Sequence, residues 1–244
     1  MSLSILILGA RSDIARACAH HYAREGYDIR LAAREVASIE ADATDLGLRY
    51  GISATAHDFD ALNTAGFDEF INGLPQLPDV VLCAIGFMGT QSESQTNPEA
   101  AAIVMRSNFE GPALFLGAMA EKFEERGSGT IIGISSVAGD RGRASNYVYG
   151  AAKAGFTAFL SGLRNRLSRT DVKIITVKPG FVATQMTEGL DLNPRLTASS
   201  EAVAEAIWKA QAKGRDVIYV KPIWQLVMTI IRCLPEFIFK KTQL

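Results

Sequence analysis

A tyrosine and a lysine stand four positions apart in the second half of the chain, as Tyr149 and Lys153. On a helix this spacing places the phenol and the ammonium on one face. A phenol with its ordinary pKa of about 10 is a poor base at neutral pH, but a nearby cation favours the phenolate and lowers that pKa. The pair therefore predicts a site that exchanges a proton with a carbonyl or an alcohol.

Short apolar runs alternate with helical patterns along the whole chain, which is typical of βαβ units on a parallel sheet. The predicted strands lie near residues 4–8, 28–32, 52–56, 80–84, 130–134, 173–177 and 217–220. The predicted helices lie near residues 12–25, 35–47, 62–73, 98–126, 146–168 and 200–213, and 184–198 is expected to be a loop. We expect a single Rossmann-type, doubly wound α/β sheet of about seven strands with helices on both faces. Ser135 and Ser136 follow the fifth strand, at the edge where such sheets bind ligands.

Composition excludes several classes of protein. The 244 residues fit one α/β domain, taken as 1–221 with an apolar helical extension at 222–244. The net charge of −1 gives no reason to expect a nucleic acid partner. Three scattered cysteines and three histidines predict neither a disulfide framework nor a metal site. The N-terminal run lacks the pattern of a signal peptide, so we expect a cytoplasmic protein.

A glycine turn follows the first strand, where Gly9 leads into a helix. Such a turn aims the free amides of the helix at a pyrophosphate. The alternative is a plain strand–helix turn with Ser12 as N-cap. The second strand ends at alanines and Arg34, where an NAD-binding protein usually carries an acidic residue. Together with Arg11, this guanidinium favours the 2′-phosphate of NADP over NAD, unless Arg34 is only a solvated residue at the start of a helix.

The glycine turn, Asn108, Ser136 and the Tyr149-x-x-x-Lys153 motif, in this order and spacing, resemble the classical short-chain dehydrogenases/reductases over about residues 4–220. The resemblance implies that Tyr149 is the general acid/base and that Ser136 stabilises the substrate oxygen. It implies that Lys153 lowers the Tyr149 pKa and binds the nicotinamide ribose, and that Asn108 holds a water for proton relay. Ser135 is set one position too far from Tyr149, and its hydroxyl is expected to bond to backbone.

The resemblance also implies an NADPH/NADP+ site. Asp58 would meet the adenine, the segment 83–86 would line the adenosine, and the Pro-Gly-x-x-x-Thr loop from Pro179 would face the nicotinamide. The expected cofactor-binding residues are Gly9, Arg11, Ser12, Asp13, Ile14, Arg34, Asp58, Phe59, Ala84, Ile85, Gly86, Tyr149, Lys153, Pro179, Gly180, Val182 and Thr184. Asp13 departs from the family pattern because it replaces a glycine near the pyrophosphate. A carboxylate pointing inward would repel the phosphates, whereas one across the helix N-terminus would be stabilised by the dipole.

The apolar stretch 223–234 is too short to cross a membrane as a helix. It is expected to pack against the core or another subunit, with a peripheral contact to the inner face of a membrane through 223–241 as the alternative. This tail, Asp13 and the segment 135–143 resemble a subgroup of the family that includes decaprenylphosphoryl-2-keto-pentose reductase, whose substrate is a lipid-linked keto-sugar. Arg141 and Arg143 would then contact such a substrate, or they are solvated loop charges.

The sequence thus predicts an NADP(H)-dependent oxidoreductase that interconverts a ketone and a secondary alcohol. Its substrate would be a small-molecule or lipid-linked carbonyl compound. The family resemblance also implies a homodimer or homotetramer, formed through the helices at 98–126 and 146–168. The alternatives are a cofactor-binding sensor without turnover and a membrane-peripheral subunit that works with a partner enzyme.

Overall fold

A computed structural model describes residues 2–189 and 191–242. Seven strands form one sheet in the order β3-β2-β1-β4-β5-β6-β9, and each neighbouring pair is parallel. The strands are β1 (Ser4–Leu8), β2 (Asp28–Ala33), β3 (Ala54–Asp58), β4 (Val80–Cys83), β5 (Ser128–Ile134), β6 (Asp171–Lys178) and β9 (Val217–Tyr219). The predicted doubly wound α/β fold is confirmed, because the strand order reverses between β1 and β4.

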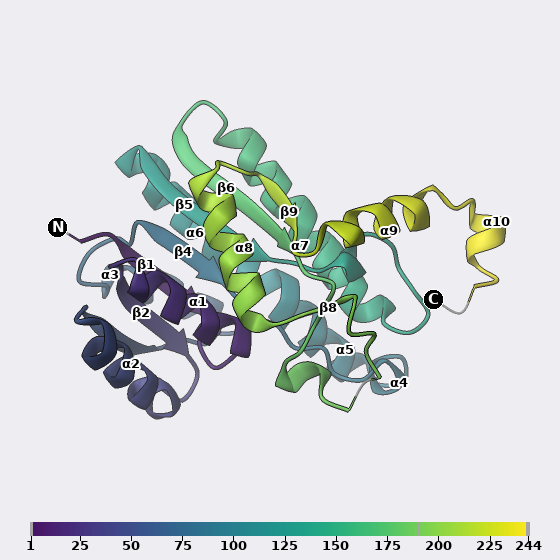
Figure 1. Cartoon of the computed structure of the whole chain (residues 1–244), viewed down its shortest axis with the longest axis horizontal. Coiled ribbons are helices and arrows are strands. Elements are labelled where there is room, and N and C mark those ends of the chain that lie inside the picture. The colour runs from purple at the N-terminus through teal and green to yellow at the C-terminus, as the bar shows by residue number, and fades with distance from the viewer. Residues whose placement is uncertain (1, 190, 243–244) are drawn as a thin grey trace.

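Helices cover both faces of this sheet (Figure 1). One apolar cluster joins the sheet to α1 (Asp13–Arg24), α2 (Ala37–Tyr50) and α8 (Ser200–Ala212). A second cluster joins the opposite face to α3 (Phe67–Asn72), α6 (Gly111–Arg126) and α7 (Tyr147–Arg166). Strands β1 and β4 are buried at every position, as expected for parallel strands covered on both sides.

The predicted helix at 98–126 is wrong as a single element. The structure divides it into α5 (Pro98–Met105), a π-helical turn at Arg106–Glu110, and α6. Pro112 has no amide hydrogen to donate to the carbonyl of Asn108, four residues earlier, so a regular α-helix loses a bond here. Gly111 also lies against the backbone of Ala61, where a Cβ would come within 2.0 Å of the carbonyl oxygen.

Other boundaries differ in smaller ways. The predicted helix at 35–47 runs instead over α2 and ends at Gly51, which takes the left-handed conformation. The predicted helix at 62–73 is only a 3-10 turn at Thr64–Gly66 followed by α3. A short helix that the sequence did not indicate, α4 (Gln91–Ser94), begins after Thr90, whose hydroxyl accepts the amide hydrogen of Glu93.

The segment at 184–198 was predicted as a loop, and Leu190 lies outside the described residues. Within it a 3-10 turn covers Gln185–Thr187, and the short strand β8 (Thr197–Ala198) pairs with β7 (Phe181–Val182). The loop therefore folds back on the chain that leaves β6.

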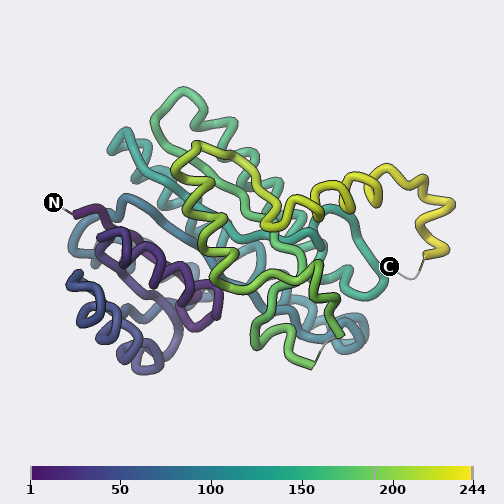
Figure 2. The backbone as a smooth tube through the Cα atoms, in the orientation of Figure 1, coloured from purple at the N-terminus to yellow at the C-terminus, as the bar shows by residue number. Residues whose placement is uncertain are grey.

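The chain ends in α9 (Pro222–Cys233) and the short α10 (Glu236–Phe239), which extend from one end of the sheet (Figure 2). The inner side of α9 is buried through Trp224, Met228 and Ile231, which form an apolar cluster with Val137. None of the helices within 2–189 and 191–242 combines the length and the apolar character that a membrane crossing needs.

Candidate active site

The turn that follows β5 packs closely against helix α7. This 3-10 turn, η3 (Val137–Gly139), begins at Ser136, whose Oγ accepts the amide hydrogen of Ala138 at 3.1 Å. Two glycines allow the close approach: a Cβ at Gly139 would come 2.7 Å from the α7 backbone, and one at Gly150 would come 2.9 Å from the carbonyl oxygen of Ala138. The packing fixes where Ser136 lies relative to the first turns of α7.

Tyr149 lies in the first turn of α7, and the side chain of Ser136 acts on its phenol. Burial of the phenol raises the Tyr149 pKa to about 12, and the Ser136 hydrogen bond only partly offsets this. Burial is the dominant cause because it disfavours the charged phenolate. The lowering expected of Lys153 does not contribute to this shift. At neutral pH Tyr149 is therefore a protonated acid, ready to donate.

Lys153 is buried one turn further along α7, with 2% of its surface exposed. Its Nζ donates to the carbonyl oxygens of Ile134 at 3.1 Å and Ile85 at 3.3 Å, which end β5 and follow β4. Burial lowers the Lys153 pKa from 10.5 to about 8, so the amine is still mostly charged at neutral pH. The ammonium lies 5.8 Å from the centre of the Tyr149 ring.

Asn108 is fully buried in the π-helical turn. Its side-chain amide donates to the carbonyl oxygens of Phe87 at 2.5 Å and Val104 at 2.8 Å, and its Oδ1 accepts the Phe87 amide hydrogen at 3.2 Å. The side chain thus fastens the loop after β4 to the helix. The expected water would have to be held by the main-chain carbonyl, which Pro112 cannot bond.

Gly86 lies where these groups meet. A Cβ on this residue would be 3.6 Å from Oδ1 of Asn108 and 4.0 Å from Nζ of Lys153. Ser135 points elsewhere: its hydroxyl donates to the carbonyl oxygen of Lys153 at 3.0 Å and contacts Oγ1 of Thr157 at 2.7 Å. The Ser135 hydroxyl is thus bonded to backbone, as expected, whereas the role of Ser136 at the site stays a prediction.

The glycine turn after β1 has the shape that a phosphate site needs. Gly9 has a φ of 76°, and a Cβ there would come 2.9 Å from the amide nitrogen of Ile85. Ser12 caps α1 by accepting the Ala15 amide hydrogen at 3.2 Å. The cap and the phosphate turn are therefore compatible, because the hydroxyl uses only one of the free amides of the helix.

The Asp13 carboxylate lies at the N-terminus of α1 and is bonded there to a loop far away in the sequence. Its Oδ2 accepts the amide hydrogen of Gln185 at 2.8 Å. The carboxylate thus joins the start of α1 to the loop after β7, across the edge at which Gly9 and Ile14 lie. Its negative charge still lies at the positive end of the α1 dipole, which stabilises it there.

The two arginines expected at the 2′-phosphate lie at the end of β2 and in the glycine turn. Arg34 is exposed, whereas Arg11 forms an ion pair of 3.1 Å with Glu35. Glu35 has a φ of 60°, which is uncommon for a residue other than glycine. Sequence reasoning overlooked this carboxylate, which competes for Arg11, although its position directly after Arg34 could have revealed it.

Other expected cofactor residues fall into two groups. Asp58 is exposed at the end of β3, on the open edge of the sheet, and Ala84 and Ile85 are half-buried after β4. The ring of Phe59 is instead buried and packs on Phe115 at 4.7 Å between ring centres. The side chain of Phe59 therefore belongs to the core, and its assignment to the cofactor site stays a prediction.

The loop after β6 begins at Pro179 and is held by the C-terminal helix. A Cβ at Gly180 would come 2.0 Å from the indole of Trp224. Further along, Val182 is buried, and Thr184 caps the following 3-10 turn together with Thr187. Trp224 was not predicted as a site residue, and no local motif marks it.

Arg141 was expected to be a solvated loop charge or a substrate contact. The first expectation is wrong because the side chain is largely buried against the C-terminal helices, and the second stays a prediction. Its guanidinium donates to the carbonyl oxygens of Ile231 at 2.5 Å and Leu234 at 2.6 Å, at the end of α9. It also pairs with Glu236 at 2.9 Å. Arg141 is thus a cap for the C-terminal helix, which sequence reasoning missed because the two segments are about 90 residues apart.

Comparisons with known proteins show the family of the chain. The sequence matches the short chain dehydrogenase family over residues 4–195. An uncharacterized oxidoreductase of Mycobacterium tuberculosis is 31% identical over 240 residues, covering 97% of this chain and 96% of the relative. The chain belongs to the short-chain dehydrogenase/reductase family and is an oxidoreductase of that family.

Solved structures share the fold. A short-chain dehydrogenase from Sphingobium yanoikuyae, in complex with NADPH, superposes with a TM-score of 0.82 at 21% identity, covering 96% of this chain and 97% of the other. A single-residue variant of the actinorhodin polyketide ketoreductase with NADPH gives a TM-score of 0.79 at 21% identity, covering 90% of this chain and 95% of the other.

Proposed function

We propose that the protein reduces a ketone to a secondary alcohol with NADPH, with Tyr149 as the proton donor. The observation that carries this proposal is the placement of three groups on one packed unit: Ser136, Tyr149 and Lys153. When bound, the reduced nicotinamide supplies a hydride. The side chains of the protein then have to orient the carbonyl, supply a proton and stabilise charge on its oxygen.

Tyr149 can supply the proton because its raised pKa keeps the phenol protonated at neutral pH. Ser136 can stabilise charge on the substrate oxygen, since a hydroxyl beside the same phenol can donate to that oxygen as its charge develops. Lys153 adds a positive charge in a site with little water, where a charge acts more strongly than in solvent. After transfer, we expect the main-chain carbonyl of Asn108 to hold the water that returns a proton to Tyr149.

NADPH is proposed as the cofactor because the residues at the adenosine end suit its extra phosphate. The exposed Arg34 follows β2, and Arg11 lies within reach of the same edge. The cradle at Gly9, which a Cβ would fill, suits the close approach of a pyrophosphate to backbone. The NADPH-bound relative of the same fold supports this choice.

A panel of ketones assayed by NADPH oxidation tests the reaction. We expect turnover of at least one bulky or polyprenyl-linked ketone, and no turnover with any member of the panel would count against the reductase. Replacing NADPH by NADH should lower the rate at equal concentration.

The outer side of the C-terminal segment supports a lipid-linked substrate or a peripheral membrane contact. Its exposed large apolar residues are Ile223, Leu226, Ile230, Phe237 and Ile238. The segment 221–244 carries four basic residues, Lys221, Arg232, Lys240 and Lys241, and one acidic residue, Glu236. It is therefore basic, although the chain as a whole is slightly acidic. Basic apolar segments of this kind bind anionic lipid surfaces.

Co-sedimentation with phosphatidylglycerol vesicles tests the contact. The variant Leu226→Glu/Ile230→Glu should no longer co-sediment with the vesicles. Leu48→Glu, which changes an even more exposed leucine on α2, should still co-sediment. Wild-type protein that stays in the supernatant would remove the membrane proposal and leave the reductase untouched.

Self-association is proposed through the long helices. Exposed apolar side chains gather on α5, the π-helical turn and α6, as Ile103, Met105, Phe109 and Leu114. A patch of this kind usually marks a surface that another protein covers. Since α5 and α6 both contact α7, a second copy of this chain would be covering the helix that carries Tyr149.

A further inference from the structure

Backbone hydrogen bonds join two loops of the site, the one that follows β5 and the one that follows β6. The amide of Val137, directly after Ser136, donates to the carbonyl oxygen of Pro179 at 3.0 Å. The amide of Ser135 donates to the carbonyl oxygen of Val177 at 2.8 Å. Residues 136–140 are called the serine turn below. Movement of this turn therefore moves the start of the Pro179 loop as well.

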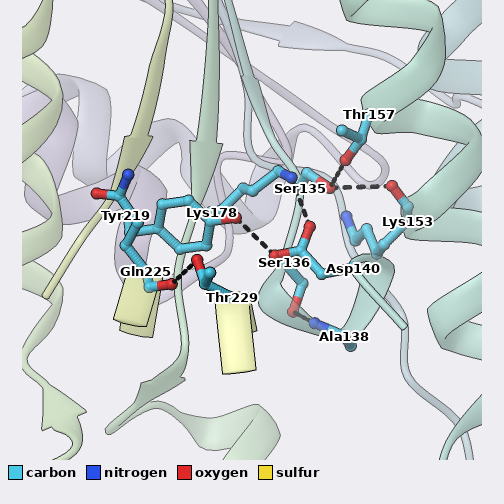
Figure 3. Close-up of polar contacts among 10 residues, drawn as sticks. All are labelled: Ser135, Ser136, Ala138, Asp140, Lys153, Thr157, Lys178, Tyr219, Gln225 and Thr229. Atoms are coloured by element: carbon cyan, nitrogen blue, oxygen red, sulfur yellow. Dashed lines mark hydrogen bonds and ion pairs between the residues drawn. The ribbon is translucent and has the colours of Figure 1, made fainter. Parts of the chain in front are cut away.

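A buried carboxylate ties these loops to the last strand. Asp140, which ends the serine turn, has a side chain only 3% exposed and accepts from Nζ of Lys178 at 2.5 Å. It also accepts from the hydroxyl of Tyr219, in β9, at 2.7 Å (Figure 3). Burial and the neighbouring carboxylate raise the Tyr219 pKa, so this hydroxyl remains a donor. A buried ion pair tolerates little change of geometry, because each partner depends on the other.

Trp224, on α9, packs against the same loops. Trp224 is packed against Gly180, meets the ring of Phe181 edge-on at 5.2 Å between centres, and donates from Nε1 to the carbonyl oxygen of Leu196 at 2.9 Å. It also shares an apolar cluster with Val137. One indole thus contacts the loop after β6, the loop before β8 and the serine turn.

The end of α9 is fixed to the serine turn as well. Arg141 follows Asp140 directly and caps the last carbonyls of α9, with its guanidinium 3.7 Å from the centre of the Phe239 ring. Asp140 therefore contacts β9, the strand before α9, and Arg141 contacts the end of α9.

We propose that β9 and α9 belong to the active site, with Tyr219 and Trp224 as positioning residues. This inference rests on the proposed reductase. Tyr219 holds the serine turn through Asp140, so it sets where the Ser136 hydroxyl stands relative to Tyr149. Trp224 holds Gly180 and the loop that follows it, on the side where the nicotinamide is expected.

The variant Tyr219→Phe removes one hydroxyl and keeps the ring. We expect kcat for ketone reduction to fall about tenfold, which corresponds to about 1.4 kcal/mol of lost transition-state stabilisation. The NADPH dissociation constant, measured by fluorescence, should stay unchanged. Amide hydrogen exchange in residues 135–141 should accelerate. Tyr50→Phe is the matched control, since its hydroxyl bonds to His20 and joins α2 to α1, away from the serine turn.

Trp224→Leu separates the two positioning roles. It should weaken NADPH binding as well as lower kcat, and Trp224→Phe should restore most of both because it keeps the aromatic packing on Phe181. Thermal unfolding of each variant shows whether it remains folded.

The outcomes are distinguishable. If wild type reduces ketones while Tyr219→Phe matches Tyr50→Phe in kcat and in exchange at 135–141, the positioning role is overturned. If wild type reduces no ketone but exchange at 135–141 still rises in Tyr219→Phe, the coupling stands and the proposed reaction fails.

Discussion

The ammonium of Lys153 lies 5.8 Å from the centre of the Tyr149 ring and is anchored to two carbonyl oxygens, of Ile85 and Ile134. The lysine is thus fixed by the ends of β4 and β5 and not by the phenol itself. The two groups have opposite shifts: burial raises the pKa of Tyr149 to about 12 and lowers that of Lys153 to about 8. The pair is suited to donating a proton in the direction of reduction.

The Lys153 pKa predicts how the reaction responds to alkali. Below about pH 8 the ammonium is charged, and above it the charge is lost while Tyr149 stays protonated. We expect kcat/KM for NADPH, which reports groups of the free enzyme, to fall as pH rises through about 8. A pH–rate profile from about pH 6 to about pH 10 checks this, and a flat profile over the range would show that the charge of Lys153 is not used.

The two serines after β5 offer a matched pair of variants. Ser136→Ala should lower kcat by about 100-fold, the usual effect of removing one donor to a developing oxyanion. Ser135→Ala should instead lower the free energy of unfolding by about 1–2 kcal/mol, because it breaks the bonds to Lys153 and Thr157, with a smaller effect on kcat. Equal losses of kcat in the two variants would contradict the assignment.

Much of this could be predicted from the sequence because the signals were local. The buried strands read as apolar runs, and Tyr149, Lys153 and Ser136 lie at fixed spacings on a helix and a strand end. The contact of Asp13 with Gln185 and the cap that Arg141 gives to α9 could not be predicted, since each joins segments far apart in the chain. Trp224 was missed for the same reason. The division of the long helix at Asn108 was foreseeable from Pro112, whose missing amide hydrogen interrupts the bonding.

Cofactor preference is expected to depend on the charges beside β2. Arg34→Ala should weaken NADPH binding about tenfold, the value of one charge-assisted hydrogen bond, and leave NADH binding unchanged. Glu35→Gln releases Arg11 from its ion pair and should tighten NADPH binding. Fluorescence titration measures both, with Arg49→Ala on α2 as the control. Tighter binding of NADH than NADPH by wild type would show that Arg34 does not meet a phosphate.

If the protein self-associates through α5 and α6, a single charged substitution in this patch should dissociate the oligomer. Leu114 is 52% exposed on α6, and Leu114→Glu should yield monomers in light scattering coupled to size exclusion. Leu48→Glu is the control, because Leu48 is 84% exposed on α2 and away from the patch. An oligomer that persists in Leu114→Glu would place the interface elsewhere.

The central claim is that the phenol of Tyr149 donates the proton. Its most direct test is the rate of NADPH oxidation by Tyr149→Phe with a ketone that wild type reduces, beside Tyr147→Phe, which changes an exposed tyrosine two positions earlier. Loss of a general acid should lower kcat by about 100-fold or more while NADPH binding is kept, and Tyr147→Phe should match wild type. A Tyr149→Phe variant that turns over the ketone at the wild-type rate would contradict the account.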